Sequence, residues 1–355
     1  MTEAGEAAGR VIAAGIHGPE LDAATRGALE RLRPGAVILF RRNIDNPRQL
    51  RALVGGLHRL PSHPLVAIDH EGGQVTRLGP PFTAFPSAAE IGRAGVDAAR
   101  AVGEAIGREL ASVDIDIDFA PVLDIGDAEG ASIVGDRAFG VDAATVTASG
   151  LAFAAGLLAG GVLPCGKQFP GHGATSVDSH VTRPVVTRSR DELWAADLVP
   201  FRAAVRAGLP MLMTAHVVYP AFDPERVATL SPAIAGELLR HELGFAGVLW
   251  SDDLMMGALS AERSPAEAAV EALAAGVDGV LICHDLDNAE RAAERLQAAV
   301  GSGELSAARL REAAARVARL AARRPQRDRR IALPSPAHGA LAEEVRVMAA
   351  SNRAC

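Results

Sequence analysis

The amino-acid sequence predicts an α/β protein built as one (β/α)8 barrel of the TIM type. Its 355 residues suit one such barrel, and a hydrophobic content of 49% is ample for a large core. Short runs that are apolar on both faces alternate with helical segments, which is typical of a parallel sheet covered by helices. Polar residues also follow the ends of these runs. A doubly wound open sheet is the alternative fold.

This alternation also places the individual elements. Eight apolar runs are the expected strands: 10–16, 36–40, 64–71, 117–125, 162–169, 209–216, 247–253 and 279–285. Alanine, leucine and arginine recur at helical spacing between them, for example at 97–112, 143–160, 191–207 and 264–275. After residue 323 the pattern changes to a charged run, a turn and one helix. We therefore expect a single barrel domain at 1–323 and a linker with a C-terminal helical tail at 324–355.

The composition argues against several classes of partner. A formal net charge of −7 disfavours nucleic acid and anionic membranes, which bind basic surfaces. The first residues lack the pattern of a signal peptide, and no apolar stretch reaches the ~20 residues of a membrane helix. Cys165, Cys283 and Cys355 are too few and too scattered for a disulfide framework. We expect a cytoplasmic protein that is a monomer or a weak homo-oligomer.

Polar residues stand at the ends of most expected strands. In a barrel these C-terminal strand ends meet at one face, where barrel enzymes carry their active sites. Lys167 belongs to this set and is the only lysine among 36 basic residues, and arginine's planar fork cannot copy its compact charge. Chance retention of one lysine is the alternative. The set consists of Arg41–Asn43, Asp69–Glu71, Asp124, Lys167–Gln168, His216, Asp252–Asp253 and His284–Asp285.

The two carboxylates of "VLWSDDLMM" follow an apolar strand. Neighbouring residues of a strand point to opposite faces, so only one of Asp252 and Asp253 needs to enter a pocket. A carboxylate at this place suits a nucleophile, a metal ligand or a helix N-cap, and the motif alone leaves all three open.

The stretch "KQFPGHGATSVDSH" places Asp178 and His180 two residues apart. The carboxylate can orient the imidazole and raise its basicity, which leaves the other ring nitrogen free for proton transfer. Glycines beside His172 permit unusual backbone angles or loop movement. A polar surface loop is one alternative. Another is a metal site formed by His172, His180, Asp178 and Asp252, although no HxH or HExxH spacing occurs. We expect no metal and no cofactor.

Two further motifs carry charged candidates for ligand binding. Asp69 and Glu71 in "AIDHEGGQVTRL" end another strand, and Arg77 follows two glycines. A carboxylate that accepts hydrogen bonds from ligand hydroxyls suits this place as well as a structural Asp–Arg pair does. Arg137, in the glycine-flanked "GDRAFG", is a weaker candidate.

Taken together, these motifs resemble glycoside hydrolase family 3, and more narrowly its single-domain bacterial β-N-acetylhexosaminidases of the cell-wall recycling type. The resemblance extends from about residue 34 to residue 320 and follows the order of the family's motifs. The matching stretches are "PGAVILFRRNI", "AIDHEGGQVTRL", "DIDFAPVLDI", "IVGDRAFG", "GKQFPGHGATSVDSH", "MTAHVVYP" and "ELGFAGVLWSDDLMM".

The resemblance implies a retaining exo-β-N-acetylglucosaminidase that acts without a cofactor on peptidoglycan fragments or chitooligosaccharides. Asp252 would be the nucleophile that forms a glycosyl-enzyme intermediate. His180, oriented by Asp178, would be the general acid/base. The implied substrate-binding residues are Asp69, Arg77, Arg137, Lys167, Gln168 and His216.

Two positions depart from the family's usual motifs. Relatives usually carry "KHFPGHG", so Gln168 stands where a histidine is common, and its amide forms hydrogen bonds without a charge. His70 replaces the commoner glutamine of "QEGG". We expect these changes to retune the sugar subsite and to leave the enzyme active. The alternatives are a phosphorylase that uses phosphate in place of water, a glycosidase with another sugar preference, and an inactive sugar-binding protein.

Overall fold

The computed structural model describes residues 3–127, 132–175, 183–260, 263–325 and 331–352. Its centre is a closed barrel of eight parallel strands in the ring order β1-β10-β9-β6-β5-β4-β3-β2. β1 pairs with both β2 and β10, so the ring is closed and the predicted barrel is confirmed over the open sheet. The barrel strands are β1 (Ile12–Gly15), β2 (Ala36–Leu39), β3 (Leu65–Ile68), β4 (Ile117–Asp118), β5 (Leu163–Phe169), β6 (Met211–Thr214), β9 (Val248–Asp253) and β10 (Gly279–Ile282).

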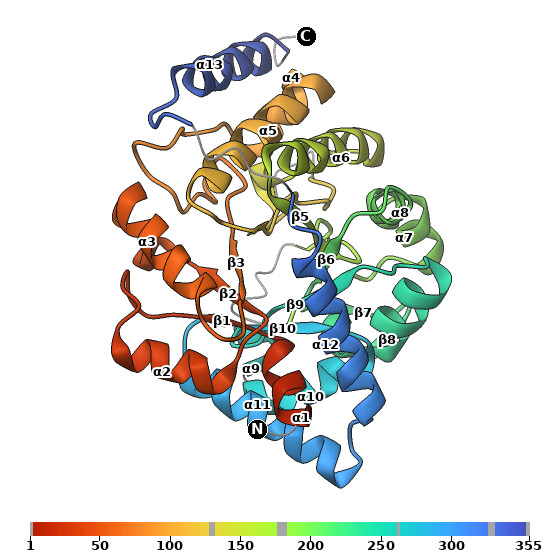
Figure 1. Cartoon of the computed structure of the whole chain (residues 1–355). Helices are drawn as coiled ribbons and strands as arrows, with labels where there is room; N and C mark the ends of the chain where they lie inside the picture. Colours follow the sequence, from red (N-terminus) through yellow and green to blue (C-terminus); the bar gives the residue numbers. More distant parts are fainter. Residues whose placement is uncertain (1–2, 128–131, 176–182, 261–262, 326–330, 353–355) are drawn as a thin grey trace.

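Helices form a layer around this ring (Figure 1). Ser87, Ser189 and Ser264 begin three of them with a capping box, in which serine and a glutamate three residues later satisfy each other's backbone N–H groups. The segment predicted as one helix at 191–207 is two helices, because the chain turns at Ala196. The helices are α1 (Glu3–Arg10), α2 (Ala23–Leu32), α3 (Pro47–His58), α4 (Ala88–Ala94), α5 (Val96–Ser112), α6 (Ala143–Gly160), α7 (Arg190–Ala195), α8 (Leu198–Arg206), η4 (Pro232–Glu242), α9 (Gly257–Ser260), α10 (Pro265–Ala275), α11 (Leu286–Ser302), α12 (Ala307–Ala321) and α13 (Pro336–Ser351). Shorter elements are the antiparallel pair β7 (Val218–Tyr219) and β8 (Asp223–Val227), and the single turns η1 (Arg41–Asn43), η2 (Gly135–Arg137) and η3 (Ala228–Leu230).

Side chains fill the interior of the barrel, which is therefore a packed core. The fully buried rings of Trp250 and Phe119 meet there edge to face, with centroids 6.5 Å apart. Val317 and Leu320 of α12 belong to the same interior cluster. Figure 1 shows α12 lying across the ring of strands, so this helix covers one end of the barrel.

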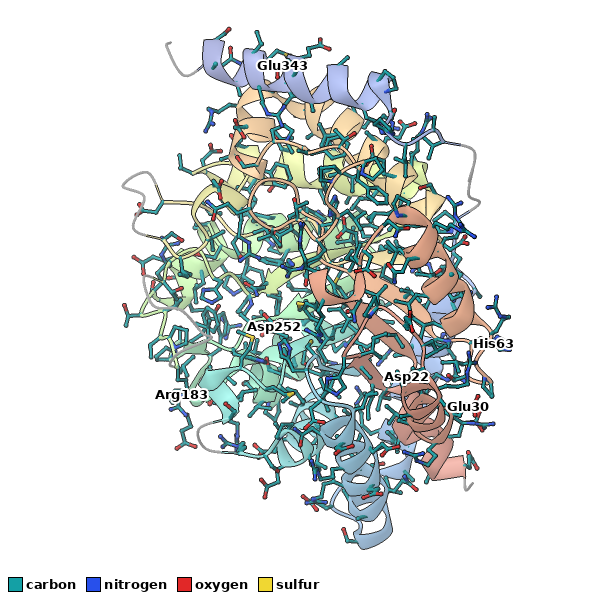
Figure 2. The ribbon with its side chains drawn as sticks, turned by 90° about the vertical axis from the view of Figure 1, so that its left-hand side faces the viewer. Asp22, Glu30, His63, Arg183, Asp252 and Glu343 are labelled. Carbon is teal, nitrogen blue, oxygen red and sulfur yellow. The ribbon has the colours of Figure 1, made fainter. Side chains whose placement is uncertain are left out.

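The C-terminal tail packs on the outer layer of helices. α13 lies against α4 and α5 (Figure 1). Its His338 places Nδ1 2.8 Å from Oε1 of Glu109 on α5, and the same glutamate accepts hydrogen bonds from Thr83. Glu109 is buried, whereas Glu343 on the other side of α13 points away from the barrel (Figure 2). A buried polar contact therefore attaches the tail to the barrel wall.

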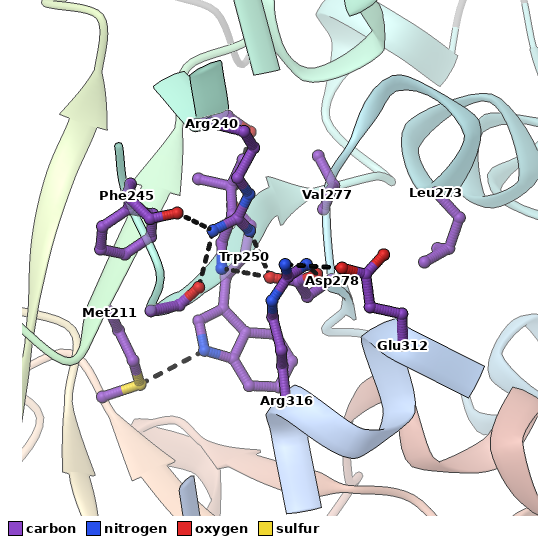
Figure 3. A network of polar contacts seen from close by, with 12 residues as sticks. Met211, Arg240, Phe245, Trp250, Leu273, Val277, Asp278, Glu312 and Arg316 are labelled. Atoms are coloured by element: carbon purple, nitrogen blue, oxygen red, sulfur yellow. Dashed lines mark hydrogen bonds and ion pairs between the residues drawn. The ribbon is translucent and has the colours of Figure 1, made fainter. Parts of the chain in front are cut away.

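Asp278, which precedes β10, anchors the covered end of the barrel. It is fully buried, and its Oδ1 accepts hydrogen bonds from Arg309 and Arg316 of α12 at 3.0 Å each. Its Oδ2 accepts from Arg240 of η4 and from the backbone N–H of Leu249. Figure 3 shows the guanidinium groups of Arg240 and Arg316 directed toward this carboxylate. One aspartate thus ties two helices to β9.

Asp116 repeats this arrangement before β4, which stands four strands from β10 in the ring. It is also fully buried, and its Oδ2 accepts a hydrogen bond of 2.7 Å from the backbone N–H of Val66 on β3. The Nε2 of His58 lies 2.7 Å from the same oxygen, and Arg324 lies 3.0 Å from Oδ1. Both aspartates therefore connect the start of one strand to the neighbouring strand.

α6 is an 18-residue helix without a charged side chain, and by length and composition alone it would suit a membrane span. It packs closely on α5. A Cβ atom added to Gly156 would lie 2.2 Å from the carbonyl oxygen of Arg100, and one added to Gly160 would lie 2.5 Å from that of Glu104. Only glycine permits such an approach of two backbones. Packing on α5 therefore accounts for the small apolar composition of α6.

Candidate active site

A cavity of about 350 Å³ opens among the C-terminal ends of the barrel strands. Figure 2 shows Asp252 near the middle of the view, whereas Glu30 and His63 lie toward its right-hand edge. Hollows of about 620 and 690 Å³ lie beside the first turn of α6 and contain none of the predicted site residues. The predicted residues that line the central cavity are Asp69, Arg77, Arg137, Lys167, Gln168 and Asp252.

Lys167 is the centre of an ion-pair cluster at one wall of the cavity. Its Nζ lies 2.8 Å from Oδ1 of Asp69 and 2.7 Å from Oε1 of Glu71. Arg137 donates two hydrogen bonds of 2.9 Å to the two oxygens of Glu71, and Arg77 lies 3.4 Å from Oδ2 of Asp69. Lys167 is 3% exposed, so its charge is balanced by these carboxylates instead of by water.

The pKa directions follow from this pairing. Burial alone would raise the pKa of Asp69 and of Glu71, but the nearby cations reverse the direction and lower both pKa values. Burial would lower the pKa of Lys167 and of Arg137, but the same carboxylates raise both. All four groups are therefore charged at neutral pH. With Arg77 the cluster has three cations and two anions, and it presents fixed donors and acceptors to a ligand.

Asp252, at the end of β9, receives two hydrogen bonds from uncharged donors. The Nε2 of Gln168 donates to its Oδ2 at 2.6 Å. The backbone N–H of Asp253 donates to its Oδ1 at 2.8 Å. Asp252 is half-buried and faces the cavity beside the Lys167 cluster. A carboxylate held in this way, next to a set of hydroxyl-binding groups, has the position that a nucleophile needs.

Asp253 also lines the cavity, although strand alternation predicts that only one of the two carboxylates needs to do so. Its Oδ1 accepts hydrogen bonds from the backbone N–H groups of Met255 and Cys283. Burial raises its pKa, as does the charge of Asp252, while the bond from Met255 opposes the rise. The Asp253 carboxylate thus stabilises the turn after β9 and binds the backbone that follows β10. Asp252 is the carboxylate that is held by one side-chain donor and one backbone donor.

Asp124 holds the turn that follows Lys167. Its carboxylate accepts a hydrogen bond of 2.7 Å from the backbone N–H of His172. The backbone N–H of Gln168 lies within 3.3 Å of both carboxylate oxygens. Burial raises the pKa of Asp124, and His172 together with these donors partly offsets the rise. Asp124 therefore fixes the backbone from which the Gln168 side chain reaches Asp252.

Comparison with known families and structures identifies the protein's family. The profile of the glycosyl hydrolase family 3 N terminal domain matches residues 10–320. The chain belongs to glycosyl hydrolase family 3. It is similar to a beta-hexosaminidase of Nitrosomonas eutropha, with 39% identity over 290 residues that cover 79% of this chain and 83% of the relative. A beta-hexosaminidase of Alkalilimnicola ehrlichii is 43% identical over 284 residues, 76% of this chain and 79% of the relative.

Solved structures of the family agree in fold. A family 3 beta-N-acetylglucosaminidase from a Paenibacillus species superposes with a TM-score of 0.93 at 34% identity, over 98% of this chain and 69% of that one. NagZ from Neisseria gonorrhoeae, solved in complex with N-trifluoroacetyl-D-glucosamine, gives 0.74 at 35% identity, over 88% of this chain and 98% of that one. This family 3 chain is accordingly a glycoside hydrolase with a TIM-type barrel.

His216 lies behind the cavity of this family 3 hydrolase. It is 1% exposed, with Nδ1 2.8 Å from the hydroxyl of Thr229 and Nε2 3.0 Å from the carbonyl oxygen of Asp253. A carbonyl oxygen only accepts, so Nε2 carries the proton and the Thr229 hydroxyl donates to Nδ1. Burial lowers the pKa of His216, which keeps the ring neutral. This geometry suits a residue that supports the peptide after Asp252, and the role in substrate binding that the resemblance implied for His216 stays a prediction.

His70 points away from the cavity as well. Its ring is 1% exposed, its Nδ1 accepts from the backbone N–H of Arg77, and its own backbone N–H donates to Asp118. Burial lowers the pKa of His70 to about 4. The change from the family's usual glutamine therefore alters the support behind Asp69 and Glu71.

Two predicted catalytic residues, Asp178 and His180, lie outside the described residues. Among those that the structure describes, no group of three or more His, Cys, Asp or Glu side chains could hold a metal ion. His172, the other histidine of that stretch, places Nδ1 2.6 Å from the hydroxyl of Thr175 and is buried. The acid/base assignment therefore remains a prediction.

Phe40 and His284 form a further part of the cavity lining, and neither was predicted as a catalytic or substrate-binding residue, although His284 belonged to the strand-end set. The ring of Phe40 stacks on His284 with centroids 5.5 Å apart, and the guanidinium groups of Arg42 and Arg77 lie 4.6 and 5.6 Å from its centre. His284 is also 3.6 Å from Asp253. The only signal in the sequence was the place of Phe40 and His284 at strand ends.

Proposed function

We propose that this family 3 hydrolase is a retaining exo-β-N-acetylglucosaminidase that releases terminal N-acetylglucosamine from peptidoglycan fragments or chitooligosaccharides. The observation that supports it best is that Asp252 faces the same cavity as the Lys167 cluster. The cluster offers charged donors and acceptors to sugar hydroxyls, and Asp252 offers a nucleophile beside them. Its similarity to a beta-hexosaminidase and to a beta-N-acetylglucosaminidase supports the sugar class.

The size of the cavity supports attack on a chain end. At about 350 Å³ it is near the lower limit for ligand pockets, which suits one sugar ring better than a glycan passing through. Lys167 and its carboxylates close the inner wall. A terminal sugar would place its hydroxyls on this wall and its anomeric carbon toward Asp252.

The proposed reaction has two steps. A carboxylate oxygen of Asp252 bonds to the anomeric carbon as the bond to the leaving oxygen breaks, and His180 donates a proton to that oxygen. Water then attacks the same carbon, gives a proton to the neutral imidazole and releases Asp252, with overall retention of configuration. Asp178 would orient His180 in both steps.

The test is p-nitrophenol release from the β-N-acetylglucosaminide and from the β-glucoside, with and without phosphate. We expect release from the N-acetyl sugar that does not depend on phosphate. Asp252→Asn should abolish turnover while binding of N-acetylglucosamine persists. Asp22→Asn is the matched control, because Asp22 is an N-cap at the surface and asparagine caps equally well. Phosphate-dependent release would identify a phosphorylase, and preference for the glucoside would refute the sugar assignment.

A further inference from the structure

We propose that Gln168 is a positioning residue for the nucleophile, and that its uncharged amide keeps Asp252 oriented and fully reactive over a pH range in which a histidine at this place would gain a charge. The inference rests on the proposed function, because it takes Asp252 to be the nucleophile. It assigns to Gln168 a role toward the enzyme's own carboxylate, beyond the sugar contact expected for this position.

The first support is the geometry at Asp252. The Gln168 bond to Oδ2, at 2.6 Å, is short, and the bond from the backbone N–H of Asp253 holds the other oxygen. Two donors from different directions define the plane of the carboxylate. Removal of the amide would leave only the bond from the backbone N–H of Asp253, which holds Oδ1 of Asp252. The attacking oxygen would then spend less time aimed at the cavity.

The second support is that Gln168 is itself held in place. Asp124 binds its backbone N–H and that of His172, so the turn is fixed at two points 4 residues apart. Asp124 is buried, and water therefore competes little for these bonds. The amide of Gln168 is consequently presented to Asp252 from a fixed backbone. Its second N–H and its carbonyl oxygen remain available for a sugar hydroxyl.

The third support is the chemistry of the two steps. A hydrogen bond to a carboxylate is charge-assisted, and it weakens when Asp252 becomes an ester in the glycosyl-enzyme. In the second step water forms its bond to the anomeric carbon, the ester bond breaks, and the electron pair returns to Asp252. The Gln168 bond regains its strength as that charge develops. Loss of the amide should therefore slow release from the intermediate.

A histidine at position 168 would behave differently with pH. Imidazole titrates near ~6.5, and an adjacent carboxylate raises that value. Below it, an imidazolium would pair with Asp252 and make the carboxylate a poorer nucleophile. Besides its own neighbour Asp253, Asp252 influences titratable groups from three other strands: Cys165 from β5, His216 after β6 and Cys283 after β10. Lys167 and His284 line the same cavity.

Lys167, His216 and the two cysteines hold constant charge near neutrality, and His284 is the same residue in wild type and in every variant. Burial lowers the pKa of His216 and raises those of Cys165 and Cys283, so that all three are neutral. Carboxylates raise the pKa of Lys167 against the effect of burial, and the ammonium stays charged. A new pH dependence between about 5.5 and 8 in a Gln168→His variant is therefore assignable to the introduced ring.

The experiment compares wild type, Gln168→His and Gln168→Leu with p-nitrophenyl β-N-acetylglucosaminide from pH 5 to 9. Gln168→His should gain an acid limb in kcat/KM with a midpoint near ~7, about tenfold per pH unit below it, and should approach wild type at pH 9. Gln168→Leu should lower kcat by about 10- to 100-fold at every pH, with KM unchanged or lower, since the intermediate accumulates. Gln297→His, on the outer helix α11, is the matched control and should keep the wild-type profile.

Two results would overturn the inference while leaving the proposed function intact. One is a Gln168→His profile parallel to that of wild type. The other is a Gln168→Leu variant whose KM rises while kcat stays constant, which would make Gln168 a hydroxyl ligand alone. Thermal unfolding of each variant within a few degrees of wild type separates these results from misfolding. A wild-type protein that releases no p-nitrophenol would overturn the proposed function, and the inference with it.

Discussion

Both ends of the barrel bury carboxylates among cations, but these ion pairs serve different purposes at the two ends. At the C-terminal end, Asp69 and Glu71 share Lys167 beside an open cavity. At the N-terminal end, Asp278 is fully enclosed, and both of its oxygens are bound by arginines. At the C-terminal end, hydrogen-bonding groups of the ion pairs face a space that a ligand can enter. At the N-terminal end, the hydrogen bonds of Asp278 join helices to strands.

The comparison shows which observation distinguishes a site from an anchor. Burial and ion pairing occur at both ends. Among the described residues, a buried guanidinium nitrogen without a hydrogen bond also occurs at both ends of the barrel, at Nε of Arg77 and at Nε of Arg240. The distinguishing observation is the cavity next to the ions, because only there can a ligand complete the bonding.

The largest expected effect comes from breaking the Lys167 cluster at the C-terminal end of the barrel. Lys167→Met removes the shared cation of Asp69 and Glu71 and a donor to the sugar. We expect kcat/KM to fall by about 10³- to 10⁴-fold, which is about 4 to 5.5 kcal/mol. Arg31→Met is the matched control, because Arg31 forms an exposed ion pair with Glu290 and its loss should change neither activity nor stability much. Near-normal activity of Lys167→Met would contradict the assignment of this wall.

Breaking the ion pairs of Asp278, at the N-terminal end of the barrel, should lower stability and leave activity unchanged. Asp278→Asn leaves Arg240, Arg309 and Arg316 without their common counter-ion, and we expect a loss of about 3–5 kcal/mol in the free energy of unfolding. The kcat/KM of the folded fraction should be unchanged. Urea unfolding and assays below the transition measure the two quantities. A selective loss of activity would show that the two ends are coupled.

His70 adds a test based on the pH dependence of the free energy of unfolding. Its pKa is about 4 in the folded protein and ~6.5 in the unfolded chain, so between these values the unfolded state binds more protons. The free energy of unfolding therefore rises with pH in this window. As pH falls from 6.5 to 4, the His70 ring lowers the free energy of unfolding by about 3 kcal/mol. His70→Gln should flatten this part of the curve. Equal slopes for the variant and wild type would show that the folded protein protonates His70 without cost.

The smallest expected effect is in the helix layer, away from both ends. Gly160→Ala places a Cβ 2.5 Å from the carbonyl oxygen of Glu104, so α5 and α6 must move apart, at about 1–3 kcal/mol. Gly301→Ala on α11 meets nothing within 4 Å and should stabilise by up to about 1 kcal/mol. Thermal unfolding of this pair separates overpacking from helix propensity. Equal shifts in both would refute the close-packing explanation.

The barrel was predictable from the sequence because each strand is apolar on both faces and the strand ends are polar. The break at Ala196 was missed, although Pro200 lies in the first turn of α8, where proline is tolerated, and would have interrupted a single helix over 191–207. β7 and β8 were also missed, because β8 has three exposed residues between two buried ones and no regular alternation. In the structure β8 pairs with β7 and contacts η3.

The site was predictable as a set of residues and less so as a set of contacts. Strand-end position placed Lys167, Asp69 and Asp252 around one cavity. The bond between Gln168 and Asp252 joins residues 84 positions apart, and it depends on the reach of one side chain across the barrel mouth. Likewise, a motif shows that His216 is near the site, but only packing shows that both of its ring nitrogens are bound within the protein.

Lys167 has one further consequence, for chemical labelling. It is the only lysine side chain of the protein, and in the folded state it is buried and paired with two carboxylates. A reagent that modifies lysine side chains therefore has a single side-chain target, which in the folded state is protonated and paired with carboxylates. The rate at which that one amine becomes modified therefore measures how often Lys167 leaves its two carboxylates, at a known residue and without an engineered probe.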